Sequence, residues 1–97
     1  MRAYAQSIPS FLATVKVRGD GLERLAEVIG AVGAADVIAN AGPPDAHGWL
    51  LLTIRLESMW YAESSMLRLG KDAEVVDPPE LRERLAAAVR EMAARYG

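Results

Sequence analysis

Few side chains in this sequence have the types and spacing that catalysis or metal binding requires. The single histidine, His47, lies in a Pro- and Gly-rich run at residues 41–48, and the chain contains no cysteine that could join it in a metal site. Ser64 and Ser65 fall within a predicted helix, without an elbow glycine or a nearby histidine to act as base. We therefore predict no catalytic residue, no metal site and no cofactor, and we expect His47 to be a solvated turn residue.

Other polar groups also have simple explanations. Glu80 and Glu83 alternate with Arg82 and Arg84, which is typical of a solvated, ion-paired helix face. The run Gly19–Gly21 comes nearest to a phosphate-binding glycine loop. Its central residue is an aspartate, so it places a negative charge where a phosphate would have to bind. We interpret this run as a turn from a strand to a helix.

One group of residues is more informative, because alternation places it on a single sheet face. Residues 11–18 and 49–57 alternate with period two, which predicts two neighbouring strands with one apolar face. The opposite face would present Leu12, Thr14, Lys16, Arg18, Trp49, Leu51, Thr53 and Arg55. Cations beside an indole suit a nucleotide or a single nucleic-acid strand, and the leucines suit a protein equally well. We predict an effector or partner surface formed by Lys16, Arg18, Trp49 and Arg55.

The elements that would position this surface follow from periodicity and from helix start and stop signals. A helix with Asp20 as its predicted cap ends at Gly30 to Gly33, and a short β-prone stretch covers residues 36–40. A second helix, capped by Ser58, runs to Leu69 and stops at Gly70. A strand at residues 73–76 precedes a last helix, for which Asp77 is the predicted cap. The order predicts an α+β, ferredoxin-like βαββαβ sandwich with an antiparallel four-stranded sheet and an additional C-terminal helix.

Length and composition set further limits. The 97 residues fit one domain, which we place at residues 10–97 after a flexible lead-in at residues 1–9. A net charge of −2 argues against gripping nucleic acid through bulk charge, and 52% hydrophobic residues are too many for a disordered tail. The chain has no signal-peptide pattern and no membrane-spanning run, so we expect a cytoplasmic location.

With these elements laid out, three segments resemble a known family. Residues 13–18 read ATVKVR, residues 48–54 read GWLLLTI, and residues 67–82 read LRLGKDAEVVDPPELR. Over about residues 11–96 the chain resembles the C-terminal extension, or WCX domain, of WYL-domain transcriptional regulators. The third segment is the most specific of the three, because it combines a helix stop, a short strand and a helix start.

The resemblance implies a non-catalytic regulatory domain that senses an effector and assists oligomerisation in a bacterial helix-turn-helix regulator. Its implied partners are the helix-turn-helix and WYL domains of that regulator, a second copy, and a nucleic-acid or nucleotide effector, with no membrane. The chain carries no Trp-Tyr-Leu motif, since Trp60 and Tyr61 precede Ala62, so no WYL ligand residue is carried over. Two alternatives remain open: an ACT-like small-molecule sensor, favoured by the turn at Gly19–Gly21, and a pure protein–protein assembly module.

Overall fold

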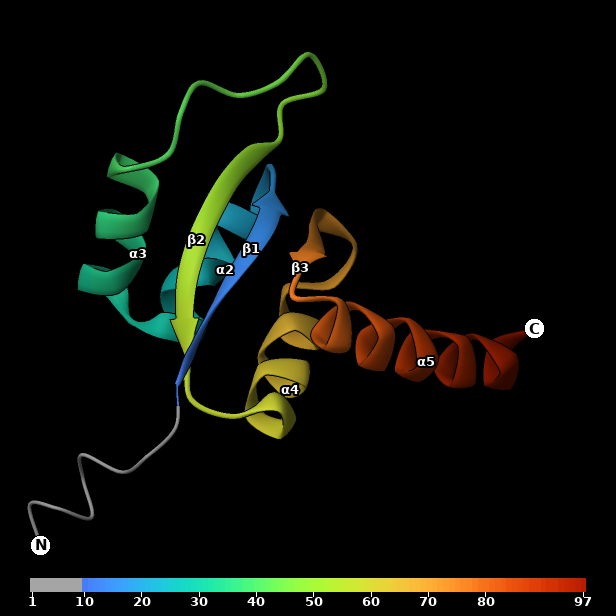
Figure 1. The fold of residues 1–97 in the computed structure, drawn as a ribbon. Coiled ribbons are helices and arrows are strands. Elements are labelled where there is room, and N and C mark those ends of the chain that lie inside the picture. The colour runs from blue at the N-terminus through green and yellow to red at the C-terminus, as the bar shows by residue number, and fades with distance from the viewer. Residues whose placement is uncertain (1–9) are drawn as a thin grey trace, which may run out of the picture.

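The alternating apolar residues form a three-stranded antiparallel sheet in the computed structural model, which describes residues 10–97. Strands β1 (Phe11–Val17), β2 (Leu50–Leu56) and β3 (Ala73–Asp77) lie in the order β2-β1-β3, so that β1 is central (Figure 1). Alternate residues of β1 and β2 are buried or half-buried, as period two requires, and in β3 Val75 is the buried residue. The lead-in predicted at residues 1–9 lies outside the described residues.

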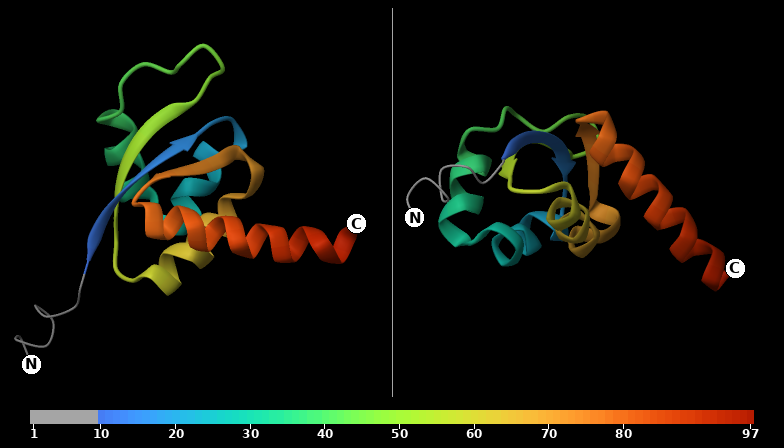
Figure 2. Two further views of the ribbon diagram at one scale, coloured as in Figure 1. Left: turned by 45° about the vertical axis from the view of Figure 1, so that its right-hand side comes forward. Right: turned by 60° about the horizontal axis from the view of Figure 1, so that its bottom comes forward.

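Helices α2 (Asp20–Ile29) and α4 (Met59–Leu69) cover one face of this sheet, as the two views of Figure 2 show. The short helix η1 (Gly70–Asp72) connects α4 to β3. Between the sheet and the helices lies a single apolar core, whose largest fully buried side chains are Leu25, Leu52, Ile54, Leu69, Leu81, Val15 and Val17. Helices α3 (Ala31–Ala39) and α5 (Pro79–Tyr96) lie at the two sides of this arrangement (Figure 1).

The prediction of a four-stranded, ferredoxin-like sheet is wrong, because the stretch at residues 36–40 is helical. Helix α3 includes most of it, and α3 lies beside β2, where we expected a fourth strand (Figure 1). Val37 and Ile38 are β-prone on their own, but helical spacing places them with the buried Ala34 on the side of α3 that packs against the core. The alanine-rich sequence around them favours the helix, so tertiary packing and helix propensity prevail over two β-branched residues.

The helix boundaries show which predicted caps form. The backbone N–H of Tyr61 donates to the Ser58 hydroxyl at 3.1 Å, so the predicted cap of α4 is confirmed. The two predicted aspartate caps are wrong: α2 begins at Asp20 itself after Gly19, and Asp77 is the last residue of β3. Gly19 has a φ of 51°, a left-handed conformation that glycine adopts most easily, so the backbone enters α2 without a side-chain cap.

Helix α5 starts against the outer edge of β3 and then leaves the domain (Figures 1 and 2). Its Arg82 donates to the backbone carbonyl of Val75 at 2.6 Å and to the carboxylate of Glu74 at 2.9 Å. Arg84 pairs with Glu63 of α4 at 3.1 Å. These contacts attach the first turns of α5 to the rest of the fold. None of the helices described here is long and apolar enough to span a membrane.

Candidate functional site

The uncovered face of the sheet carries all four residues singled out from the sequence. In the pairing of β1 with β2, Leu12 lies opposite Arg55, Thr14 opposite Thr53, and Lys16 opposite Leu51. Leu12 and Leu51 are 53% and 55% exposed, so the helices leave this face open. A sheet face with exposed leucines and cations is a surface that can bind a ligand or another protein.

Arg18 and Trp49 come together at one end of this face. The guanidinium carbon of Arg18 lies 4.4 Å from the centre of the Trp49 ring, within the range of a cation–π contact. The Nε atom of Arg18 also lies 3.5 Å from the Asp72 carboxylate. The Arg18 side chain is therefore held between an indole and an acid, and 42% of it is still exposed.

Asp72 was not predicted as a site residue, yet it organises this end of the molecule. Its side chain is 10% exposed, and its carboxylate lies within 4.0 Å of cations from three segments: Arg18 after β1, Arg24 in α2 and Lys71 in η1. Three cations and one carboxylate give these four groups a formal charge of +2. We call Arg18, Arg24, Trp49, Lys71 and Asp72 the Arg18 cluster. Nothing in the local sequence around Asp72 indicated that it would be buried beside cations.

A second acid, Asp45, fixes the position of Trp49. The backbone N–H groups of His47 and Trp49 donate to one Asp45 carboxylate oxygen at 2.8 and 3.0 Å, and Gly48 completes the turn with a φ of 85°. These two backbone hydrogen bonds, that from Trp49 first, hold the pKa of Asp45 below its usual value, because they favour the ionised carboxylate. The run Asp45–Gly48 is an Asx-turn pattern, so this role could have been found from the sequence.

Lys16 and Arg55 lie at different distances from the Arg18 cluster. Lys16 is two residues from Arg18 on the same strand face, next to the cluster. Arg55 is six residues from Trp49 along β2, or about 20 Å at the usual rise of a strand. Its guanidinium donates to the Ser10 hydroxyl at 3.1 Å instead. The four predicted residues share a face, but only Lys16, Arg18 and Trp49 form one neighbourhood.

The third strand adds acids that the sequence analysis did not place on this face. Glu74 pairs with Lys16 and Asp77 pairs with Thr14, with a bulge between these two positions. The carboxylate of Glu74 is already bound by Arg82. The middle of the open face therefore carries charges of both signs, whereas the charged groups of the Arg18 cluster have an excess of positive charge.

The remaining candidates have structural surroundings that account for them. His47 is an exposed residue of the Asp45 turn, and Ser65 is buried within α4, 2% exposed. A Cβ atom on Gly21 would lie 2.9 Å from the backbone carbonyl oxygen of Asp72, so this glycine permits α2 to approach η1 closely. Residues 10–97 contain no group of three or more His, Cys, Asp or Glu residues that could hold a metal ion.

An α+β domain with an open sheet face and one aromatic–cationic corner has the geometry of a binding module. The family model of the WCX domain matches residues 9–93, and the chain belongs to this family. The resemblance inferred from the sequence is thereby confirmed, and it supports a regulatory role in general terms. Searches of the curated proteins and of the solved structures found no match to this chain.

Proposed function

We propose that this chain is the non-catalytic, effector-sensing and oligomerisation domain of a bacterial WYL-type helix-turn-helix regulator. We further propose that its effector is anionic and aromatic, a nucleotide or a single nucleic-acid strand, and binds at the Arg18 cluster. The observation that carries this proposal is the position of Arg18, which is stacked on Trp49 and linked to Asp72 in a group of three cations and one carboxylate with a formal charge of +2.

The chemistry of the corner supports this class of effector. A half-buried indole such as that of Trp49 offers a stacking surface for any base, and arginine and lysine side chains contact phosphates. Asp72 restrains Arg18 before a ligand arrives, which lowers the entropy lost on binding. Lys16, on the same strand face, would extend the cationic surface along the phosphate backbone of a longer ligand.

The test is a fluorescence titration of Trp49 with ATP and with a short single-stranded oligonucleotide. The only other tryptophan is Trp60, so a Trp60→Phe background leaves Trp49 as the sole indole. We expect quenching by at least one of the two ligands, and affinity that falls as salt rises, because counterions are released from phosphates. Arg18→Gln should weaken binding by about tenfold or more, since both stacking support and charge are lost.

Arg55→Gln is the matched control, because it removes the same charge from the same face at the distant end. It should change the affinity by less than about threefold, as expected of a cation outside the binding corner. Two results would contradict the proposal: no quenching by either ligand, or equal losses in Arg18→Gln and Arg55→Gln.

Protein contact is a second candidate function, favoured by the exposure of Leu12 and Leu51 on the open face. In that case a second copy of the chain covers the sheet, and both leucines become buried. Leu51→Asp would then abolish the association while leaving effector binding at the corner intact. Light scattering over a dilution series measures this outcome, and an unchanged association would contradict it.

A further inference from the structure

Helix α5 changes its surroundings along its length. Leu81 in its first turn is fully buried and Leu85 is half-buried, whereas Met92 and Tyr96 are 48% and 89% exposed. The helix has 18 residues, or about 27 Å, and its C-terminal half projects beyond the domain (Figures 1 and 2). The apolar stripe that fixes its first turns therefore continues along a part of the helix that the rest of the domain does not cover.

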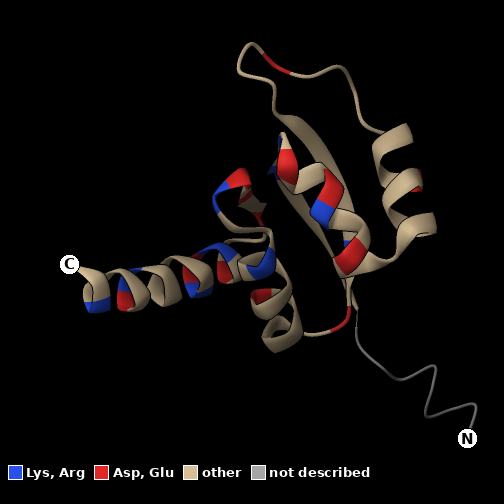
Figure 3. Ribbon diagram, turned by 180° about the vertical axis from the view of Figure 1, so that it is seen from behind, with Lys and Arg blue, Asp and Glu red and all other residues tan. Residues whose placement is uncertain are grey.

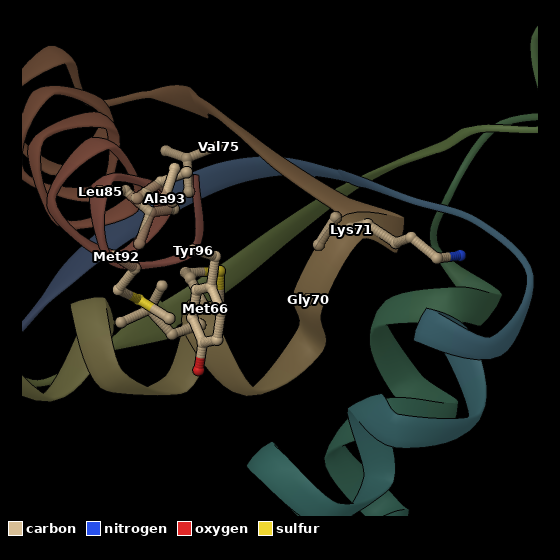
Figure 4. A pocket seen from close by; sticks show the side chains of 11 residues that line it. Met66, Gly70, Lys71, Val75, Leu85, Met92, Ala93 and Tyr96 are labelled. Atoms are coloured by element: carbon tan, nitrogen blue, oxygen red, sulfur yellow. The ribbon is translucent and has the colours of Figure 1, made fainter.

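A groove runs beside this projecting half. It has a volume of about 500 Å³ and lies between the α5 stripe and a wall formed by α4, η1 and β3 (Figure 4). Met66, Leu67 and Val75 contribute to the wall, and Leu85, Val89 and Met92 contribute from the helix. The exposed apolar residues Val89, Met92 and Tyr96 of α5, which we call the ridge, thus also form one side of the groove.

We propose that the α5 helices of two copies of this chain pack antiparallel about a two-fold axis near Val89 and Met92. Each ridge would then enter the groove of the other copy. A two-fold interface needs a surface that is complementary to itself, and a ridge beside a groove on one helix meets that requirement. This inference rests on the oligomerisation role proposed above. It assigns that role to a surface distinct from the Arg18 cluster, where we propose that the effector binds.

Charge and the uncovered last turns of α5 favour a second copy as the occupant. The last turns of α5 have few partners within the domain, and a helix segment of this length is marginal in water without tertiary packing. The helix carries four arginines and three glutamates, interleaved along its length (Figure 3), so two copies do not repel each other strongly. Antiparallel packing also places opposite ends of the two helix dipoles side by side.

The first experiment compares two glutamate substitutions on α5 in the 97-residue chain. Met92→Glu places a charge on the ridge, and Ala87→Glu places the same charge on the opposite side of the helix at an exposed position. Glutamate is a good helix former, so both variants should keep their circular dichroism spectrum. Sedimentation over a dilution series should show a dimer for the wild type and Ala87→Glu, and a dissociation constant raised at least about tenfold for Met92→Glu.

A cross-linking experiment gives an answer that does not depend on destabilising the interface. The chain has no cysteine, so Met92→Cys and Ala87→Cys each introduce a single thiol. A short bifunctional maleimide should link two copies of Met92→Cys and leave Ala87→Cys largely unlinked, because only the first thiol lies near the two-fold axis.

The outcomes separate this inference from the proposals on which it rests. A wild-type dimer that survives Met92→Glu, or equal cross-linking of the two cysteine variants, overturns the α5 interface but leaves the oligomerisation role intact. A wild type that is monomeric at all concentrations overturns both. Effector binding at the Arg18 cluster is measured separately and is unaffected by either result.

Discussion

The two faces of the sheet are built from neighbouring residues of the same strands, yet their surroundings differ. On the helix-covered face, Leu52 is 1% exposed and packs in the core, whereas Leu51 on the open face is 55% exposed. The covered face is uniformly apolar, and the open face mixes leucines, threonines and charges of both signs. Period-two alternation therefore divides one ribbon into a face that stabilises the fold and a face that is available for binding.

The largest effect that we predict from this comparison is a difference in stability between substitutions of two adjacent leucines. Leu52→Ala should reduce the free energy of unfolding by about 3 kcal/mol, because it leaves a cavity in a close-packed core. Leu51→Ala makes the same chemical change one residue away and should cost less than about 1 kcal/mol. Urea unfolding of the two variants measures both values. Losses of similar size would mean that the open face is covered in solution.

A smaller effect is expected at Gly21, where α2 lies against η1 and the end of β1. A Cβ atom at Gly21 would lie 2.9 Å from both the Asp72 carbonyl oxygen and a Val17 methyl group, and the former is backbone that cannot rotate away. Gly21→Ala should therefore destabilise the fold by about 1–3 kcal/mol. It should also weaken effector binding, because displacing Asp72 disturbs the Arg18 cluster.

Gly33→Ala in α3 is the matched control for this effect. A Cβ atom there would meet only Ile29 side-chain atoms, the nearest at 3.8 Å, so alanine should stabilise the helix by about 0.5–1 kcal/mol. Thermal unfolding of the two variants should therefore shift the midpoint in opposite directions. Shifts in the same direction would contradict the close approach of α2 to η1.

The smallest effect concerns the turn that carries Trp49 on the open face. The pKa of Asp45 is lowered in the folded protein, so the stabilisation from its ionised form is complete above the unfolded value of 3.8. It is lost as the pH falls through the lower, folded pKa. In an NMR titration, the amide signals of Trp49 and His47 should shift with a midpoint below 3.8.

Asp45→Asn provides the control for this titration. The asparagine side-chain oxygen can still accept both backbone hydrogen bonds, so the turn should persist while the acidic titration disappears. A midpoint at or above 3.8 in the unsubstituted protein would show that these hydrogen bonds do not form in solution.

Local sequence patterns predicted most helices and strands correctly. They failed where the choice between helix and strand depended on tertiary packing. Strand alternation in residues 11–17 and 50–56 identified the correct faces of β1 and β2, because side-chain direction follows from backbone geometry alone. Val37 and Ile38 were assigned to a strand because residues 36–40, taken alone, do not show that they belong to a helix packed against the core. The wrong prediction of a fourth strand follows from that one error.

The candidate site was predictable to a similar extent. The period-two alternation placed Arg18 and Trp49 on one face. The six positions from Trp49 to Arg55, about 20 Å at the usual rise of a strand, already separate Arg55 from that pair, and grouping the four residues by face alone overlooked this distance. The cations Arg24 and Lys71 were missed because their proximity depends on Asp72, which the folding of three separate segments buries. A pattern within one strand carries no information about such a junction.

Helices flank the sheet on both of its outer strands, and this has a consequence for how the domain behaves among its neighbours. Helix α3 lies beside β2, and Arg82 of α5 occupies the Val75 carbonyl on β3 (Figure 1). Exposed edge strands are the usual templates for pairing between chains, which leads to fibrils or mixed assemblies. With a helix beside each edge, this domain can expose its open sheet face to neighbouring molecules while resisting growth into a continuous intermolecular β-structure.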